Sequence, residues 1–418
     1  MQSLPGFRDF YPAPVPIKDA WSADLRHHIL DSWRATARRY GFREYDGPPL
    51  EPTELYTLKS GAEILQQLFH FEDKGGRAVA LRPEMTPTLA RMVALGERHY
   101  KKPIKWFAIP QLFRYEKQQR GRLREHFQFN ADLFGESDPA ADAEIIALLI
   151  DSLRDLRLGP DDFVVRLSSR LAWQRFFERE GGQPDRAYDF YQAVDKLERD
   201  PPEVADAQLQ AVGTSLERVR QFIADAEPDE ALDAIRSNLA ARGLADFARI
   251  DYGVIRGLAY YTGVVFEAFD CKGQFRAIAG GGRYDQLVGL VSGGKVNLPG
   301  LGFGMGDVVL AELLKARNLL PEFRAGLDSF VLIEDEALRP ESLRLVQDLR
   351  QAGRPTDYPL TPTKPDKQFK RAQELGVART LRLERQPDGS LVVRVRDLAT
   401  RTDRLEPLDS FRSARSDG

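Results

Sequence analysis

The chain has 418 residues and a formal net charge of −3, with 60 lysines and arginines against 63 aspartates and glutamates. Overall charge therefore does not indicate a nucleic-acid partner, and any basic binding surface has to be local. The single cysteine, Cys271, excludes disulfides within the chain and cysteine-rich zinc sites, and the five histidines lack metal-ligand spacing, so no protein metal site is predicted. This length predicts two or three domains. Without an apolar run long enough for a membrane or a signal peptide, we expect a cytoplasmic protein with no membrane partner.

The first long element expected is a helix between about Trp21 and Tyr40, where apolar side chains recur at helical spacing. Gly41 is typical of a helix C-terminus. A short strand over residues 42–45 and two prolines follow. This order of helix, strand and proline resembles motif 1 of class II aminoacyl-tRNA synthetases. The pattern is common in other proteins, so an ordinary surface helix remains an alternative. The stripe consists of Trp21, Leu25, Ile29, Trp33, Ala37 and Tyr40.

Residues 69–72 and 78–81 are expected to form a hairpin around a glycine-containing turn. The second strand runs into Arg82-Pro83-Glu84-Met85-Thr86, where the proline fixes a turn before the next helix. A carboxylate and a hydroxyl in this position often cap a helix. Capping is therefore one interpretation of Glu84 and Thr86, and ligand binding is the other.

A polar row is expected on two strands, residues 112–116 and 125–135, that follow a strand over 105–109. Period-2 alternation places Arg114 and Glu116 on one face of the first strand. On the second strand it places His126, Gln128, Asn130 and Asp132 on one face. A row facing the core would be apolar, so this row is predicted to line a site. The joining loop holds Lys117, Arg120, Arg122 and Arg124, which suit nucleic-acid phosphates or a solvated turn.

A helix is predicted over 140–158, a strand over 163–167 and a helical segment over 171–248. The β-branched and aromatic run 264–269 predicts a buried strand, and Gly273 suggests a hairpin into a second strand ending at Ile278. Glycine-rich turns that carry an arginine and a tyrosine are expected on both sides of this hairpin. Glycine allows the backbone to approach a ligand closely. The arginine guanidinium offers a fork of hydrogen-bond donors for an anionic group, and the tyrosine ring offers a flat surface for packing. The alternative is a hairpin with core tyrosines and a solvated arginine.

Residues 301–310 predict a glycine-rich strand that runs into a helix, or a tight turn without a ligand. After a linker over 323–326, strands over 329–333, 380–383 and 391–395 alternate with helices over 340–352 and 364–375. This pattern predicts a separate α/β domain with a mixed sheet. The residues after Asp409 form a polar tail.

Taken in order, these segments resemble the motifs of histidyl-tRNA synthetases, a family of class II aminoacyl-tRNA synthetases, over nearly the whole chain. The segments 255–263 and 279–285 resemble its two histidine-binding signatures. The resemblance implies an α+β fold with a mostly antiparallel class II sheet. The implied domains are a catalytic domain over 1–325 with a helical insertion at about 171–248, an anticodon-binding α/β domain over 326–410, and a mobile tail over 411–418.

The implied activity is that of a homodimeric enzyme that activates L-histidine with ATP and Mg²⁺ and transfers it to tRNA(His). The arginines implied in catalysis, Arg114 and Arg256, would stabilise charge in the transition state. Histidine binding is implied for Glu84, Met85, Thr86, Arg114, Gln128, Asp132, Arg256, Tyr260, Tyr261 and Tyr284. ATP binding is implied for Arg114, Glu116, His126, Phe127, Gly304 and Gly306. tRNA binding is implied for Arg120, Arg122, Lys367 and Lys370.

The chain departs from the family pattern at three positions. His126 stands where many members have phenylalanine, Asp132 where many have glutamate, and Val309 at the usual arginine of motif 3. One alternative is the non-catalytic regulatory paralogue of ATP phosphoribosyltransferase, which senses histidine and usually lacks the anticodon domain. Another is a tRNA sensor without catalysis. The C-terminal domain and the retained Arg256 favour the enzyme.

Overall fold

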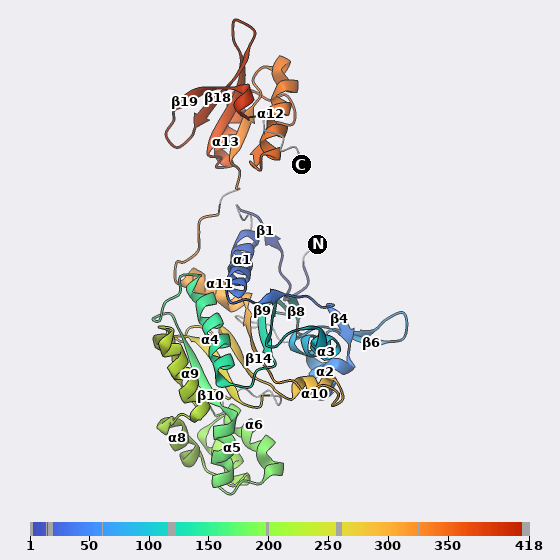
Figure 1. Cartoon of the computed structure of the whole chain (residues 1–418), viewed down its shortest axis with the longest axis vertical. Helices are drawn as coiled ribbons and strands as arrows, with labels where there is room; N and C mark the ends of the chain where they lie inside the picture. Colours follow the sequence, from blue (N-terminus) through green and yellow to red (C-terminus); the bar gives the residue numbers. More distant parts are fainter. Residues whose placement is uncertain are drawn as a thin grey trace. The chain divides into compact units, whose positions relative to one another are not determined.

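The computed structural model describes residues 3–13, 15, 20–60, 62–115, 123–197, 200–255, 261–323 and 326–411. The chain divides into two compact units, the first ending at Leu320 and the second continuing from Pro321 (Figure 1). The buried apolar clusters of the first unit reach Leu319, and those of the second begin at Leu327, so each unit has its own core. In these ranges, no helix combines the length and apolar character needed to cross a membrane.

The first unit is built on a nine-stranded sheet. Its strands are β3 (Arg43–Glu44), β7 (Ile104–Ala108), β8 (Gln111–Phe113), β9 (Glu125–Phe134), β10 (Phe163–Ser169), β11 (Ala248–Ile250), β12 (Val264–Asp270), β13 (Ala279–Arg283) and β14 (Gly300–Gly306). The order is β11-β10-β12-β13-β14-β9-β7-β3, and β8 also pairs with β9. The pairs β10–β11 and β3–β7 are parallel and the others antiparallel. The predicted α+β class with a mostly antiparallel sheet is confirmed.

One face of this sheet is covered by α1 (Ala23–Arg39), α4 (Pro139–Arg154) and α11 (Asp307–Ala316) (Figure 1). Helix α1 contacts both other helices, all three contact β9, and α4 also contacts β14. The Ser22 hydroxyl caps α1 by accepting from the Leu25 amide, and Gly41 follows the helix with φ +77°. Trp33, in the middle of the predicted stripe, is fully buried and stacks on Phe129 with ring centroids 5.7 Å apart. The stripe therefore packs largely inside its own unit.

The opposite face carries α3 (Thr86–Gly96), which packs against α10 (Leu287–Val291). Beside α3 lie α2 (Glu54–Ser60) and a three-stranded sheet in the order β4-β6-β5. Its strands are β4 (Leu50–Pro52), β5 (His70–Glu72) and β6 (Ala78–Leu81). Strands β5 and β6 are antiparallel, which confirms the predicted hairpin. Two short strands, β1 (Phe10–Tyr11) and β2 (Trp21–Ser22), pair near the N-terminus.

The predicted insertion is helical. It contains α5 (Arg170–Arg179), α6 (Ala187–Asp195), α7 (Pro202–Ala211), α8 (Leu216–Asp225) and α9 (Glu230–Ala241). Trp173 is fully buried and contacts Phe222 at 4.7 Å between ring centroids. In the described parts of both units, short 3₁₀ turns lie at Ala62–Gln67, Glu97–His99, Pro184–Arg186, Ala245–Phe247, Glu336–Leu338 and Leu408–Phe411.

The predicted hairpin near Gly273 is wrong in one respect. The second strand does not end at Ile278; it runs from Ala279 to Arg283 and includes the three glycines that were predicted to form a turn. A Cβ on Gly281 would lie only 2.6 Å from the Phe266 ring and would also meet the backbone of β14. Because glycine is normally depleted in strands, the sequence favoured a turn, whereas close packing requires glycine here.

The second unit contains β15 (Ser329–Leu332), β16 (Thr356–Asp357), β17 (Arg379–Arg385), β18 (Leu391–Asp397) and β19 (Asp403–Pro407) in the order β16-β15-β17-β18-β19. Helices α12 (Arg339–Gln351) and α13 (Pro365–Glu374) complete it. β15 is parallel to both neighbours and the other pairs are antiparallel, so the predicted mixed sheet is confirmed. Both edge strands, β16 and β19, were missed, because β16 has two residues and β19 is largely charged and exposed.

Candidate active site

A narrow cavity of about 70 Å³ lies where β9, β13 and β14 meet the segment before α3. It brings together residues from six separate segments of the chain. Its lining consists of Glu84, Thr86, Arg114, Gln128, Asn130, Asp132, Tyr261, Gly280, Tyr284, Gly302, Phe303 and Gly304. Most of these residues were predicted to lie at a site; Gly280, Gly302 and Phe303 were not. The lining combines carboxylates, a guanidinium, amides and phenols, which is a suitable environment for a small zwitterion.

The alternation predicted for β9 is confirmed. Gln128, Asn130 and Asp132 line the cavity, whereas Phe129 and Ala131 are fully buried. Within the described ranges, Asn130 Oδ1 and Asp132 Oδ2 are buried without a hydrogen-bond partner. Buried polar atoms are normally paired, so two unpaired acceptors at one cavity indicate a ligand that donates hydrogen bonds.

Burial strongly perturbs Asp132 in this cavity. It is 1% exposed, and burial raises the pKa of its carboxyl to about 7, although a short hydrogen bond from the Tyr284 hydroxyl to Oδ1 opposes the shift. Tyr284 thus fixes one carboxylate oxygen and leaves the other towards the cavity. A carboxyl in this state can hold or release a proton near neutral pH.

Glycines of β14 make room for these side chains. Gly302 pairs with Asp132 across the sheet, and a Cβ on Gly302 would overlap the Asp132 carboxylate. A Cβ on Gly304 would similarly overlap the side-chain amide of Gln128. Because Gly302 and Gly304 have no side chains, the polar groups of β9 can lie across this face of β14. The signal for Gly302 was present in the sequence, because it belongs to the same glycine alternation as the predicted Gly304.

Glu84, just before α3, and Thr86, the first residue of α3, line the cavity together with Arg114. The N-cap residue of α3 is Met85, which has no capping side chain, so neither Glu84 nor Thr86 occupies the N-cap position of the capping interpretation. Arg114 Nε donates to the Pro83 carbonyl oxygen at 2.9 Å, which orients the guanidinium. Met85 does not line the cavity: its side chain is fully buried, with Sδ 3.7 Å from Arg82 Nη1.

Arg283, from the second glycine-rich segment, has its partners within the protein. Its Nη2 forms a short ion pair with buried Asp142 of α4, and Nη1 donates to the Glu136 carbonyl oxygen at 2.9 Å. Burial raises the pKa of Asp142 to about 6, and Arg283 opposes that shift. The expectation that this arginine serves a ligand is therefore wrong, because a protein carboxylate occupies its fork.

The residues predicted to bind ATP lie on two different faces of the sheet. A Cβ on Gly306 would lie 3.8 Å from the His126 ring, so these two residues adjoin at the end of β14. The ring of Phe127 instead packs edge-to-face on Phe10 with centroids 6.1 Å apart and contacts the Arg26 guanidinium at 5.3 Å. This side chain belongs to the face away from the cavity, as the strand alternation requires.

Several predicted site residues lie outside the described residues. They are Glu116, Arg120, Arg122, Arg256 and Tyr260.

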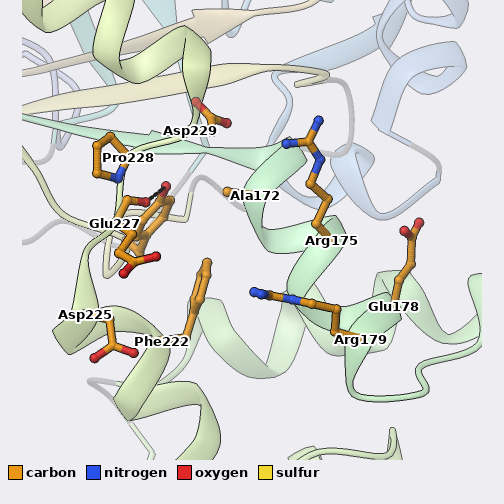
Figure 2. Close-up of a pocket in the computed structure, with 10 residues that line it drawn as sticks. Ala172, Arg175, Glu178, Arg179, Phe222, Asp225, Glu227, Pro228 and Asp229 are labelled. Carbon is orange, nitrogen blue, oxygen red and sulfur yellow. Dashed lines mark hydrogen bonds between the residues drawn. The ribbon is translucent and has the colours of Figure 1, made fainter.

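Two larger cavities lie elsewhere. One of about 690 Å³ lies in the helical insertion and is lined by Arg175, Arg179, Phe222 and Glu227 among others; Arg179 points towards Phe222 (Figure 2). It contains none of the predicted site residues. The other, about 410 Å³, lies in the second unit and is lined by Phe369, Lys370 and three arginines of β17 and β18. Phe369 packs against the core of that unit and also contacts the Arg396 guanidinium at 5.5 Å. Lys367 does not line this cavity.

Comparison with known proteins places the chain among similar sequences. Residues 19–306 match the profile of a family described as histidyl-tRNA synthetase. The chain is 45% identical to the histidine–tRNA ligase of Opitutus terrae over 99% of this chain and 97% of that protein. It is 36% identical to the chloroplastic/mitochondrial histidine–tRNA ligase of Arabidopsis thaliana, over 93% of this chain and 82% of that one.

Solved structures with the same fold are more distant in sequence. Histidyl-tRNA synthetase from Nostoc sp. PCC 7120 superposes with a TM-score of 0.78 at 22% identity, covering 98% of this chain and 97% of that one. A Bacillus halodurans chain described as an ATP phosphoribosyltransferase regulatory subunit/histidyl-tRNA synthetase gives a TM-score of 0.70 at 21% identity, covering 88% and 96%. At these identities the likeness establishes the fold.

Proposed function

Because the chain belongs to the histidyl-tRNA synthetase family and is a histidine–tRNA ligase, we propose that the cavity between β9, β14 and α3 binds L-histidine. The substrates of such a ligase are histidine, ATP and tRNA. The full-length relatives favour this enzyme over the regulatory paralogue. The observation that carries the location is the buried, unpartnered Asp132 Oδ2 in a cavity that also holds Glu84 and Arg114.

The charges of the cavity match the three polar ends of histidine. The Glu84 carboxylate suits the ammonium, with Thr86 and Gln128 beside it. The Arg114 guanidinium suits the carboxylate. Asp132 accepts the imidazole N–H through Oδ2, while Tyr284 holds its other oxygen. Tyr261 forms part of the same wall, and Tyr260 and Arg256 are proposed to complete the site.

In the activation step, a carboxylate oxygen of histidine attacks the α-phosphorus of ATP, a new P–O bond forms, and the bond to pyrophosphate breaks. We place the adenine side near His126 and Gly306 rather than at Phe127, whose ring packs elsewhere. Arg114 and Arg256 stabilise the negative charge that develops at phosphorus. A terminal ribose hydroxyl of tRNA then attacks the carbonyl carbon and releases AMP.

Magnesium is proposed as the companion of ATP, bound mainly by phosphate oxygens as Mg²⁺ usually is. Two nearby carboxylates are unsuited to hold it. Both Glu125 and Asp307 pair with Arg8, and each side chain is at most 4% exposed. We therefore assign no protein ligand set to the metal.

The second unit is proposed as the anticodon-binding domain. Its cavity places the Phe369 ring beside Arg396 and Lys370, and unpaired bases are bound by stacking and by cations. We propose Lys367, Arg120 and Arg122 as further tRNA contacts. A homodimer and a cytoplasmic location are proposed from the family. The dimer surface has to lie beyond the buried part of the α1 stripe, since Trp33 is fully buried within its own unit.

The test is histidine-dependent exchange of pyrophosphate into ATP. The protein should catalyse it, and Asp132→Asn should raise the KM for histidine about tenfold to a hundredfold, because a hydrogen bond to a charged group contributes about 1.5–3 kcal/mol. The KM for ATP should stay unchanged. Asp246→Asn, a change at an exposed residue of the insertion, is the control and should behave as the parent protein. Pyrophosphate exchange that proceeds equally well without histidine would contradict the proposed function.

The affinity for histidine should depend on pH. Asp132 has a pKa of about 7 and free imidazole one of about 6.5, so both are protonated in acid. Neutral imidazole bound to ionised Asp132 requires the loss of both protons. The KM for histidine should therefore be flat above about pH 7.5 and rise on acidification, approaching a hundredfold per pH unit below about pH 6. Asp132→Asn should reduce this slope to about tenfold per unit. A KM that is constant from pH 5.5 to 8 would contradict the assignment.

A further inference from the structure

Residues 4–10, here called the N-terminal strap, contact both ends of the segment that joins β8 to β9. The ring of Phe7 lies 5.8 Å from that of Phe69 and 6.4 Å from that of Phe113 at the end of β8. The carbonyl oxygen of Gly6 accepts from the amide of Arg124 at 3.0 Å, just before β9. None of these contacts is used by the function proposed above.

Arg8 is the centre of the strap. Its side chain is 2% exposed, and Nε donates to Glu125 Oε1 at 2.5 Å while Nη1 donates to Asp307 Oδ2 at 2.9 Å. Its guanidinium also lies 4.6 Å from the ring centre of Trp21 and 4.9 Å from that of Phe10. One buried cation therefore bridges two buried carboxylates between aromatic rings.

The two carboxylates also accept hydrogen bonds from residues of β8 and β9. Glu125 Oε2 accepts from the Gln111 side-chain amide at 2.9 Å, and Asp307 Oδ1 accepts from the Phe127 amide at 3.0 Å. Glu125 and Phe127 flank His126 at the start of β9, and Asp307 directly follows Gly306. The network therefore fixes the spacing between the start of β9 and the end of β14, on both sides of His126 and Gly306.

We infer that Arg8 is a positioning residue for the ATP side of the active site, acting through Glu125 and Asp307 on His126 and Gly306. This inference rests on the proposed function. Without the guanidinium, two buried carboxylates would remain close together and uncompensated, and their repulsion would separate β9 from α11. The imidazole end of the histidine site should be unaffected, because Asp132 lies seven residues further along β9, about 23 Å at 3.3 Å per residue.

The test compares Arg8→Met with the parent in histidine-dependent pyrophosphate exchange on the full chain. We expect the KM for ATP to rise at least tenfold while the KM for histidine stays within about twofold. Arg218→Met is the matched control, because Arg218 pairs with Glu180 at 2.7 Å in the insertion, away from the site. It should change neither constant.

Two further measurements separate positioning from simple loss of packing. Adding Glu125→Gln and Asp307→Asn to Arg8→Met should recover most of the ATP affinity, because these amides remove the repulsion and keep the oxygen that accepts from Phe127. The ATP defect of Arg8→Met alone should also shrink as the pH falls and the carboxylates protonate. If Arg8→Met does not fold, Arg8→Lys replaces it in the test. Lysine keeps the positive charge but lacks the two-pronged guanidinium, so the KM for ATP should rise less than in Arg8→Met.

The outcomes are distinguishable. If the parent protein shows no histidine-dependent exchange, the proposed function fails. If the parent is active and both KM values rise together, or the ATP defect is independent of pH and not rescued by the amides, Arg8 is only a structural residue and the inference is overturned.

Discussion

Arg114→Gln should lower the rate of histidyl-adenylate formation by about a hundredfold to a thousandfold, the usual cost of losing a donor to developing charge. Arg114 and Glu84 line the same cavity, and Arg114 Nε donates to the Pro83 carbonyl oxygen at 2.9 Å. Its remaining donors are thus oriented before substrates bind, so little reorganisation is required at the reaction. Single-turnover formation of labelled adenylate at saturating histidine and ATP measures the chemical step directly.

The control for this change is Arg77→Gln. Arg77 lies in the turn between β5 and β6, is 79% exposed on its side chain and pairs with Asp73. It should leave the rate unchanged. A normal adenylation rate in Arg114→Gln would remove this arginine from the mechanism. A normal rate at saturation with a raised KM for histidine would restrict it to ground-state binding.

Ending the chain after Leu320 should abolish most tRNA charging, with a loss in kcat/KM for tRNA of about a thousandfold or more. Pyrophosphate exchange should persist, because the apolar clusters of the first unit include no residue beyond Leu319. The lost binding should include phosphate contacts, so charging by the shortened protein should depend less on salt concentration. Initial rates of charging and exchange, each measured between about 50 and 200 mM salt, check both statements.

A point variant in the intact chain serves as control for the truncation. Arg396→Gln removes the cation beside Phe369 while the rest of the domain stays in place, and it should weaken tRNA binding without altering exchange. Arg404→Gln, at a mostly exposed residue on the edge strand β19 that pairs with Glu406, should have little effect. Full charging by the truncated protein would show that the second unit does not bind the anticodon.

The sequence by itself determined the family, the α+β class, the helical insertion and the polar row on β9. The row was predictable because a strand alternates with a period of two, so the spacing of Gln128, Asn130 and Asp132 alone places them on one face. The same rule places Phe127 on the other face, where its ring packs on Phe10. These are local properties, set by neighbouring residues along one segment.

Only the tertiary structure decided which of these side chains have partners. Arg283 was expected to serve a ligand, but it pairs with Asp142, 141 residues away in the chain. The glycines at 280–282 were expected in a turn, but the close approach of Phe266 and β14 holds them in a strand. Arg8 joins Glu125 and Asp307, which are 117 and 299 residues away. Such pairings depend on where distant segments meet when the sheet and helices pack, and no local pattern of residues encodes that meeting.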